Sequence, residues 1–527
     1  MTLKSRHMLD KRALLAFAAI GLALLACARS NVAPSAAIGS GELPSPSSAP
    51  TEIDETPAPT IPVPTRLPAT ETPAQPEPVV SPTFPATPTS AAVETEEPQT
   101  LVYEAQPGDS LKSVAIRFGV LPEEVASTDV LPQGNRMIDP GQILLIPKRL
   151  AETSPEERLI PDSEMVFSPN ASSFDIEAFV DSQPGYLKRY RETVYGKWRS
   201  GAEVVGLVAR NNSVNPRLLL AMLEYKAGWL SNPTKPEDDE FLYPMGIEDP
   251  QIPGLYRQLT WLANELGNGY YGWRAGTVTE LRFEDGATLR LAPELNAGTV
   301  ALQYFFSLDQ SAASWQQEWG SQAFLDVYTS YFGDPWAYDY PLFEPGVEQP
   351  PLILPFLEGR LWSFTGGPHG AWERESAWAA LDFAPAASVS GCYLSEDWAT
   401  ASAPGIVVRS EDGTVVLDLD GDGREHSGWA LLYLHIAEED RVPEGELLAA
   451  GDLIGHPSCE GGIATGTHIH IARKYNGEWI LADGPIPFNL EGWVAQAGSN
   501  PYQGALVRGA EEVLACTCAT RETLITR

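Results

Sequence analysis

Two short stretches, Tyr433-Leu434-His435 and Thr467-His468-Ile469-His470-Ile471, decide how the C-terminal part of this 527-residue chain folds. Side chains alternate between the two faces of a β-strand, so His468 and His470 share one face, with Cα atoms roughly 7 Å apart, and the isoleucines share the other. Six of the seven histidines lie between His369 and His470. We therefore predict a polar site built on a rigid sheet in this region.

The charge of the chain limits its partners. It carries 70 acidic and 35 basic side chains, which gives a formal net charge of -35 at pH 7. Such a chain repels the phosphates of nucleic acids and of anionic lipid headgroups, so the composition argues against both as ligands.

Residues 1–27 have the pattern of an export signal. A basic patch precedes the apolar run 13–26, which is shorter than the roughly 20 residues of a membrane-spanning helix. The run ends in Leu24-Leu25-Ala26-Cys27, which resembles the cleavage box of bacterial lipoproteins. That resemblance implies cleavage before Cys27, acylation of its thiol and an anchor in the cell membrane, with the folded part facing the cell wall. The alternative is an ordinary signal peptide in which Cys27 is incidental.

Residues 28–100 are predicted to be a disordered spacer. Of the 46 prolines, 16 lie between residues 31 and 100, among threonine, serine, alanine and glutamate. This composition cannot bury a core, and in a polyproline II conformation it spans roughly 200 Å at most. The spacer is therefore long enough to hold the folded part away from the membrane.

Residues 101–149 are predicted to form the first folded unit. Gln106-Pro107-Gly108-Asp109-Ser110-Leu111 indicates a turn into a helix that Asp109 caps, and Pro140-Gly141-Gln142 indicates a second turn into a strand ending at Pro147. These two motifs resemble those of a LysM module. The resemblance implies a βααβ fold that binds N-acetylglucosamine-containing glycans, such as those of peptidoglycan.

Residues 150–345 are predicted to be helical, and the segments around Val214-Asn215-Pro216 and Asn296-Ala297-Gly298 resemble lysozyme-like transglycosylases. That family uses a glutamate as general acid, but Lys226 occupies the position here, and a lysine with a pKa near 10 cannot protonate a glycosidic oxygen at neutral pH. Glu224 lies two residues earlier and points about 200° away around the helix. We predict a degenerate, non-catalytic lysozyme-like domain; a plain helical spacer and an active glycosidase are the alternatives.

Residues 346–500 carry the predicted site. His369 follows a Gly-rich loop, Ala380-Leu381-Asp382-Phe383-Ala384 has the pattern of a buried strand with one carboxylate, and the two histidine stretches come next. This order resembles the lysostaphin-type (LytM-like) zinc metallopeptidases. The resemblance implies that Asp382 and His470 bind Zn²⁺ and that His435 and His468 are the catalytic pair.

The third zinc ligand departs from the family pattern. Family members place a histidine four residues before the aspartate, where this chain has Trp378. We assign His369 instead, because its Gly-rich loop can fold back; His456 is the competitor, for which we predict a structural role beside Cys459. His426 lies in a polar turn and is predicted to face solvent. Three protein ligands leave the fourth zinc position to water, as in catalytic sites.

Four of the five cysteines remain in the exported part, where an oxidising compartment permits disulfides. Of the three possible pairings we favour Cys392–Cys459, since both lie in the histidine-bearing region. A Cys516–Cys518 bond would close a tight ring, and free thiols are the alternative.

Residues 418–423 have the D-x-D-x-D-G spacing of a calcium loop, but position twelve of the loop, where a glutamate would bind the ion, is Trp429. We therefore predict an acidic hairpin turn.

These features predict a multidomain α+β protein: a small βααβ LysM module, an all-α lysozyme-like domain and a mainly antiparallel β metallopeptidase domain, followed by a tail at 501–527. The predicted function is a peptidoglycan-remodelling zinc endopeptidase that hydrolyses peptide crosslinks. A non-catalytic, peptidoglycan-binding regulator of another wall hydrolase and a glycan-cleaving enzyme are the alternatives.

Overall fold

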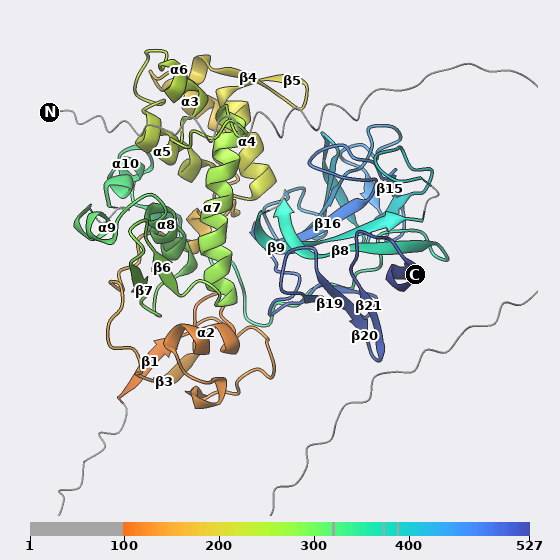
Figure 1. Ribbon diagram of the computed structural model, residues 1–527, viewed down its shortest axis with the longest axis horizontal. Coiled ribbons are helices and arrows are strands. Elements are labelled where there is room, and N and C mark those ends of the chain that lie inside the picture. The colour runs from red at the N-terminus through yellow and green to blue at the C-terminus, as the bar shows by residue number, and fades with distance from the viewer. Residues whose placement is uncertain (1–98, 319–321, 373–374, 387–388) are drawn as a thin grey trace, which may run out of the picture. The chain divides into compact units, whose positions relative to one another are not determined.

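The computed structural model describes residues 99–318, 322–372, 375–386 and 389–527 (Figure 1). The predicted signal peptide with Cys27, and the predicted spacer up to residue 98, lie outside these residues. Within the described part, no helix combines the length and the apolarity that a membrane span needs.

The first folded unit is a small antiparallel sheet with one helix. The strands follow the order β1-β3-β2, and their bounds are β1 (Thr100–Glu104), β2 (Ala126–Ser127) and β3 (Ile143–Pro147), with helix α2 (Leu111–Phe118) between β1 and β2. The predicted second helix does not form. A 3-10 turn, Pro122–Glu124, takes its place, because Val125 turns extended and Ala126 then pairs with Leu145. Pairing with the central strand outweighs weak local helix propensity.

The cap of α2 also differs from the prediction. Ser110 is the N-cap and accepts a hydrogen bond from the Ser113 amide, in a reciprocal capping box. Asp109 is instead turned into the unit, where it accepts hydrogen bonds from the Tyr103 hydroxyl at 2.6 Å and pairs with Arg117. The carboxylate therefore stabilises the small core and does not cap the helix.

The region between residues 150 and 345 is mainly helical, as predicted. Its helices are α3 (Ile176–Ser182), α4 (Gly201–Asn212), α5 (Pro216–Ala227), α6 (Asp238–Leu242), α7 (Leu255–Ala275), α8 (Ala297–Ser307), α9 (Ala312–Glu318) and α10 (Gln322–Phe332). Asn215 caps α5 and Pro216 occupies its first position, which the sequence pattern predicts.

The helical region is not all-α. Two hairpins interrupt it, formed by β4 (Arg191–Val194) with β5 (Lys197–Ser200) and by β6 (Glu280–Arg282) with β7 (Thr288–Arg290). The first hairpin turns at Tyr195-Gly196, where both residues have positive φ. This two-residue turn matches the twist of a hairpin.

The C-terminal region is built on a nine-stranded antiparallel sheet. Its main path runs β14-β11-β12-β13-β16-β9-β8-β22, and β17 pairs with β16. The bounds are β8 (Leu361–Trp372), β9 (Glu375–Pro385), β11 (Gly405–Glu411), β12 (Thr414–Asp418), β13 (Trp429–Leu434), β14 (Leu447–Leu448), β16 (Ile469–Tyr475), β17 (Glu478–Trp479) and β22 (Leu524–Thr526).

Residues 501–527, predicted as a separate tail, belong to this region. A four-stranded sheet contains β18 (Asn489–Leu490), β19 (Trp493–Ala497), β20 (Gly504–Arg508) and β21 (Glu511–Leu514), and β22 then pairs with β8. A further short pair joins β10 (Ala399–Thr400) to β15 (Leu453–Gly455). Ile525 is buried against the edge of the large sheet, so the chain end contributes to the core.

The two faces of the large sheet are covered differently. Leu381, Phe383 and Ile471 point into an apolar core that includes Trp362. On the opposite face, alanines 380 and 472 join the core of the helical region, and α7 lies against β9 (Figure 1). Because side chains alternate along a strand, Asp382 and His470 lie on this second face.

Candidate active site

Three neighbouring strands position the predicted ligands. His369 lies on β8, Asp382 on β9 and His470 on β16, and β9 is the middle strand of the three. His470 is directly opposite Asp382 in the β16–β9 pair. The cross-strand pairing therefore brings together residues that are 88 positions apart in the sequence.

His369 reaches the same face through an irregular strand. The pairing of β8 with β9 shifts register around Gly366 and again at His369, as in a β-bulge that re-aims a side chain. At Gly366, a Cβ atom would lie 2.5 Å from Asp382 Oδ2. The glycine thus leaves room for the carboxylate, and the irregular register turns the imidazole of His369 towards it.

The three side chains meet at one point. His369 Nε2 lies 3.0 Å from His470 Nδ1 and 3.2 Å from Asp382 Oδ1, and His470 Nδ1 lies 3.3 Å from the same oxygen. All three residues are buried. Ligand atoms about 2.0–2.1 Å from a tetrahedral zinc ion are separated by similar distances, so the spacing fits zinc.

The backbone partners of the imidazoles determine which nitrogens carry lone pairs. His369 Nδ1 lies 2.8 Å from the Gly367 carbonyl and His470 Nε2 lies 3.0 Å from the Ala371 carbonyl. A carbonyl oxygen only accepts, so both of these nitrogens donate, and in the neutral imidazole the lone pair is then on the facing nitrogen. Two lone pairs and Asp382 Oδ1, a buried oxygen without a hydrogen-bond donor, then face one another. This arrangement is stable around a cation.

The electrostatics of the cluster agree with metal binding. Burial alone would raise the pKa of Asp382, but the facing His369 and His468 outweigh it and lower that pKa well below its usual value. Burial, with His369 beside it, lowers the pKa of His470. A charged carboxylate and a neutral imidazole are the forms that bind zinc.

His435 and His468 flank the cluster. His468 Nε2 is 3.8 Å from Asp382 Oδ1, and the rings of His435 and His468 are 4.4 Å apart. Their Nδ1 atoms donate to the carbonyls of Glu460 and Gly466 at 2.8 and 2.7 Å, so in the neutral form of each ring the lone pair is on Nε2. Burial and the neighbouring imidazoles lower the pKa of His435 to about 3.

The other histidines lie away from the cluster. His456 Nδ1 is 2.9 Å from the Asp397 carbonyl, and its ring packs on Trp398 at 3.9 Å, in keeping with the predicted structural role. The prediction that His426 faces solvent is wrong. His426 is buried and stacks on Phe167 with ring centroids 3.7 Å apart, because the helical region covers the turn that contains it.

Tyr502 is a neighbour of the site that sequence reasoning missed. Its ring stacks on His369 at 4.1 Å between centroids, and its backbone bonds to Gly367 and Pro368. Tyr502 has a positive φ of 68°, uncommon for a residue other than glycine. No sequence motif marks it, since the contact depends on the fold of residues 498–504 beside β8.

The cysteines form two disulfides in the structure, Cys392–Cys459 and Cys516–Cys518. The first is the pairing favoured from sequence; the second closes the tight ring for which free thiols were the alternative. Both suit an oxidising, extracytoplasmic location.

In the acidic turn, Asp418 is buried and accepts backbone hydrogen bonds from Asp420 and Gly423.

The helical region places Glu224 and Lys226 in structural roles. Glu224 accepts hydrogen bonds from the backbone of Leu230 and Ser231 at 2.8 and 3.1 Å, so it holds the chain after α5. Lys226 pairs with Asp309 at 3.2 Å.

Two sequence comparisons cover most of the folded chain. Residues 158–345 match the family model described as LasA, N-terminal domain. Protease LasA of Pseudomonas aeruginosa, from strains UCBPP-PA14 and PAO1, is 25% identical over 348 residues, which are 61% of this chain and 75% of that protein. The N-terminal match covers the region for which the sequence predicts a lysozyme-like domain.

The similar solved structures cover a minority of this chain. The M23 metalloprotease pseudoalterin is 20% identical over 34% of this chain and 99% of its own, with a TM-score of 0.28. The catalytic domain of lysostaphin from Staphylococcus simulans is 19% identical over 23% of this chain and 87% of its own, with a TM-score of 0.16. These scores are too low to carry the assignment. The similarity to Protease LasA and the buried His-Asp-His cluster support the conclusion instead: this chain is a zinc metallopeptidase similar to Protease LasA, and its residues 158–345 are similar to the LasA N-terminal domain.

Proposed function

We propose that this metallopeptidase hydrolyses peptide crosslinks of bacterial peptidoglycan, with His435 and His468 as the catalytic pair beside zinc at His369, Asp382 and His470. One observation carries the proposal: in both flanking histidines a backbone carbonyl accepts the Nδ1 proton, so the neutral imidazole keeps its lone pair on Nε2, next to the cluster. The similarity to Protease LasA supports peptide hydrolysis as the reaction.

Zinc bound by the three ligands supplies Lewis-acid polarisation of the scissile carbonyl and activation of water for attack. The chain moves the protons. The Nε2 of His468 or of His435 accepts a proton from the attacking water, and the protonated imidazole then donates it to the nitrogen of the leaving amine. The carbonyls of Glu460 and Gly466 keep both rings oriented during the transfer.

The test separates chemistry from metal binding. We expect His435→Ala and His468→Ala to lower kcat about 10²–10⁴-fold, the usual contribution of a general base, while each variant keeps one zinc per chain. The measurements are release of new amino termini from purified cell wall and metal analysis. Stoichiometric zinc in the wild-type protein without any cleavage would instead favour a regulator of another wall hydrolase.

The same digest tests the glycosidase alternative. Glu224→Gln serves as the matched control, since a glutamine oxygen can still accept the amide hydrogen bonds of residues 230 and 231. We expect this variant to release amino termini at the wild-type rate. Reducing ends that appear with the wild-type protein and are lost with Glu224→Gln would revive glycan cleavage by the helical region.

We further propose that the unit at 101–149 binds glycan as a LysM-like module, that the helical region is a non-catalytic lysozyme-like domain, and that Cys27 anchors the protein to the membrane. The Pro-Gly turns and the pairing of β1 with β3 support the first assignment. The lipoprotein-like cleavage box supports the last. We expect Cys27→Ser to abolish incorporation of labelled palmitate and to release the protein from membranes.

A further inference from the structure

A cavity of about 440 Å³ lies apart from the histidine cluster. This volume falls within the ~300–1,000 Å³ of small-molecule sites. Its walls come from three parts of the chain: the C-terminal half of α7, strand β9 with the loop at 481–485, and the N-terminal unit. None of the three zinc ligands lines it, so the cavity is separate from the metal site.

Trp378 connects the cavity to the catalytic face of the sheet. It lies on β9, four residues before Asp382, so both side chains are on the same face, with Cα atoms roughly 13 Å apart. This is the position where lysostaphin-type enzymes have a histidine. Here the indole lines the cavity and takes no part in the metal cluster.

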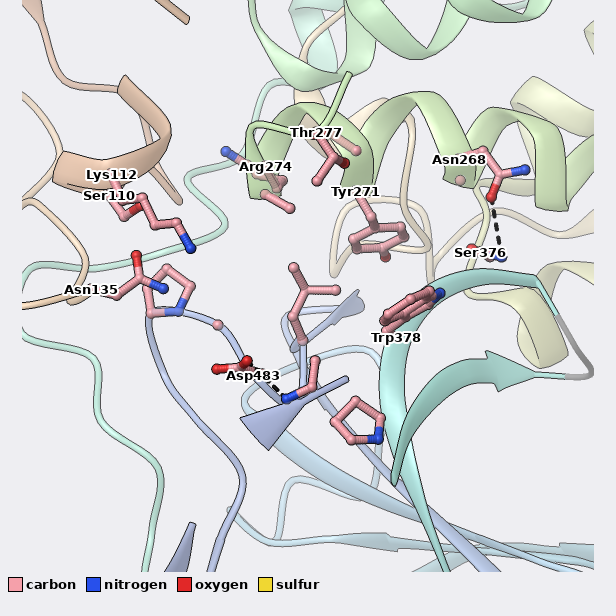
Figure 2. Close-up of a pocket in the computed structure, with 18 residues that line it drawn as sticks. Ser110, Lys112, Asn135, Asn268, Tyr271, Arg274, Thr277, Ser376, Trp378 and Asp483 are labelled. Atoms are coloured by element: carbon pink, nitrogen blue, oxygen red, sulfur yellow. Dashed lines mark hydrogen bonds between the residues drawn. The ribbon is translucent and has the colours of Figure 1, made fainter. Parts of the chain in front are cut away.

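Two aromatic rings and several polar side chains line the cavity. Figure 2 shows Tyr271 and Trp378 towards one side and Lys112, Asn135 and Asp483 towards the other. The hydroxyl of Tyr271 accepts a hydrogen bond from the Trp479 amide at 3.1 Å, which fixes its ring. The polar side chains are exposed at the surface of the protein.

The charges that line the cavity are balanced. Within the described residues, no ion pair joins Lys112 or Asp483 to an opposite charge. Arg274 also lines the cavity, but its guanidinium is already bound to Glu478 and Asp162, each at 3.0 Å. The Lys112 ammonium and the Asp483 carboxylate remain without an ion pair, although Asp483 Oδ2 accepts a hydrogen bond from the Ala497 amide at 2.9 Å, so the site does not select a charged ligand.

We propose that this cavity is a saccharide subsite, which holds a sugar unit of the glycan strand while the attached peptide reaches the histidine cluster. The inference rests on the proposed function and adds the sugar unit as a group that the enzyme recognises. The aromatic rings offer flat apolar surfaces for the C–H face of a pyranose. The lysine, asparagine and aspartate offer donors and acceptors to hydroxyl and acetamido groups, which both donate and accept.

The spacing supports this assignment. An extended peptide advances about 3.3 Å per residue, so the roughly 13 Å between residues 378 and 382 corresponds to about four peptide residues. A short peptide attached to a sugar can therefore span from the cavity to the zinc ligands. Besides its two aromatic rings, the cavity is lined by aliphatic, hydroxyl, amide and charged side chains, and the polar ones can bond to the hydroxyl and acetamido groups of a sugar.

The experiment compares two substrates with the full-length protein. One is a crosslinked wall fragment that keeps its sugars, and the other is the same crosslinked peptide after the glycan has been removed. We expect the wild-type protein to have the lower KM for the first. Trp378→Ala should raise KM for the glycan-bearing fragment about tenfold more than for the free peptide, through loss of aromatic packing, with zinc content unchanged.

Two further variants make the comparison specific. Asp483→Ala changes an exposed residue on the opposite side of the cavity and should shift KM in the same selective way. Trp198→Ala is the matched control, because Trp198 is 74% exposed on a distant hairpin and should affect neither substrate. Equal effects of Trp378→Ala on both substrates, or no wild-type preference for the glycan-bearing fragment, would overturn the proposal.

A binding measurement keeps this inference distinct from the proposed function. If the zinc-loaded protein cuts neither substrate, the proposed function fails, and titration with N-acetylglucosamine oligosaccharide tests the cavity alone. Tryptophan fluorescence should report binding that weakens about tenfold in Trp378→Ala and in Asp483→Ala. Unchanged affinity in both variants would place the sugar elsewhere and overturn the subsite.

Discussion

The zinc cluster depends on a residue that has no side chain. Gly366 pairs with Asp382 across β8 and β9, and a Cβ there would lie 2.5 Å from Asp382 Oδ2. The zinc site therefore depends on three ligand side chains and on the absence of a side chain at residue 366. Substitutions that keep all four histidines of the site can still destroy it.

We expect Gly366→Ala to displace the Asp382 carboxylate and to lower zinc affinity by at least about tenfold, the effect typical of disturbing a ligand's surroundings. Titration with a competing chelator measures this. Gly206→Ala in helix α4 is the control. A Cβ atom at this position would lie 3.4 Å from its nearest neighbour, which is an ordinary van der Waals contact. Wild-type zinc affinity in Gly366→Ala would contradict the role given to the glycine.

The assignment of His369 rather than His456 as the third ligand makes a second prediction. His369→Ala should lower zinc affinity by well over about tenfold, because it removes a direct ligand and not only a supporting group. His456→Ala should keep one zinc per chain, since its ring packs on Trp398 outside the cluster. The opposite pattern in metal analysis would exchange the two roles.

At the scale of elements, β16 joins the catalytic face to a buried charged group. Lys474 on this strand pairs with Glu425 at 3.0 Å, and Arg409 on β11 pairs with the same carboxylate at 3.1 Å. The adjacent His426 is enclosed between these charges and Phe167. Burial lowers the pKa of His426 to about 3, although Glu425 opposes the shift.

This shift predicts a loss of stability in acid. The unfolded chain gains a proton on His426 below its ordinary pKa of about 6.5, and the folded chain does not until about pH 3. Because of this group, the free energy of unfolding falls by up to about 1.4 kcal/mol per pH unit as the pH falls from 6.5 towards 3. His426→Phe should weaken the pH dependence of the unfolding midpoint in that window. Parallel curves of the unfolding midpoint against pH for the wild-type protein and the variant would refute the lowered pKa of His426.

At the scale of the whole folded part, one arginine connects three regions. Arg274 at the end of α7 donates to the Pro107 carbonyl in the N-terminal unit and to Glu478 on β17 in the peptidase region. Within the helical region it pairs with Asp162 at 3.0 Å, and Tyr270 donates to Glu478 at 2.7 Å. All these groups are largely buried, so the network is sensitive to the loss of any one member.

We expect Glu478→Ala to destabilise the fold by about 3–5 kcal/mol, because it leaves a buried guanidinium without its main partner. The shift of the midpoint in denaturant titration measures this effect. Arg282→Ala provides the control, since its ion pair with Glu280 is solvent-exposed and contributes at most about 1 kcal/mol. Similar midpoints for the two variants would show that the network does not hold the regions together.

The sequence predicted local elements where local forces decide them. The turn into α2, the start of α5 at Asn215-Pro216 and the strand that carries Asp382 form as expected, because caps, proline and alternation act over a few residues. The predictions from sequence were wrong where segments far apart in the chain determine the local structure by their contacts. The second helix implied by the resemblance to a βααβ module is replaced by a 3-10 turn at Pro122–Glu124 and the strand Ala126–Ser127, and His426 is buried under the helical region.

By itself, the sequence determined that the chemistry lies on one sheet face, since the alternation in Thr467-His468-Ile469-His470-Ile471 is a property of any strand. The resemblance of the motifs to lysostaphin-type peptidases predicted Asp382, His435 and His468 as site residues. Only the tertiary structure decided how His369 reaches the cluster, which tautomers face inward and that Tyr502 covers a ligand. These features depend on register shifts, backbone carbonyls and segments more than a hundred residues apart, and no local pattern encodes such contacts.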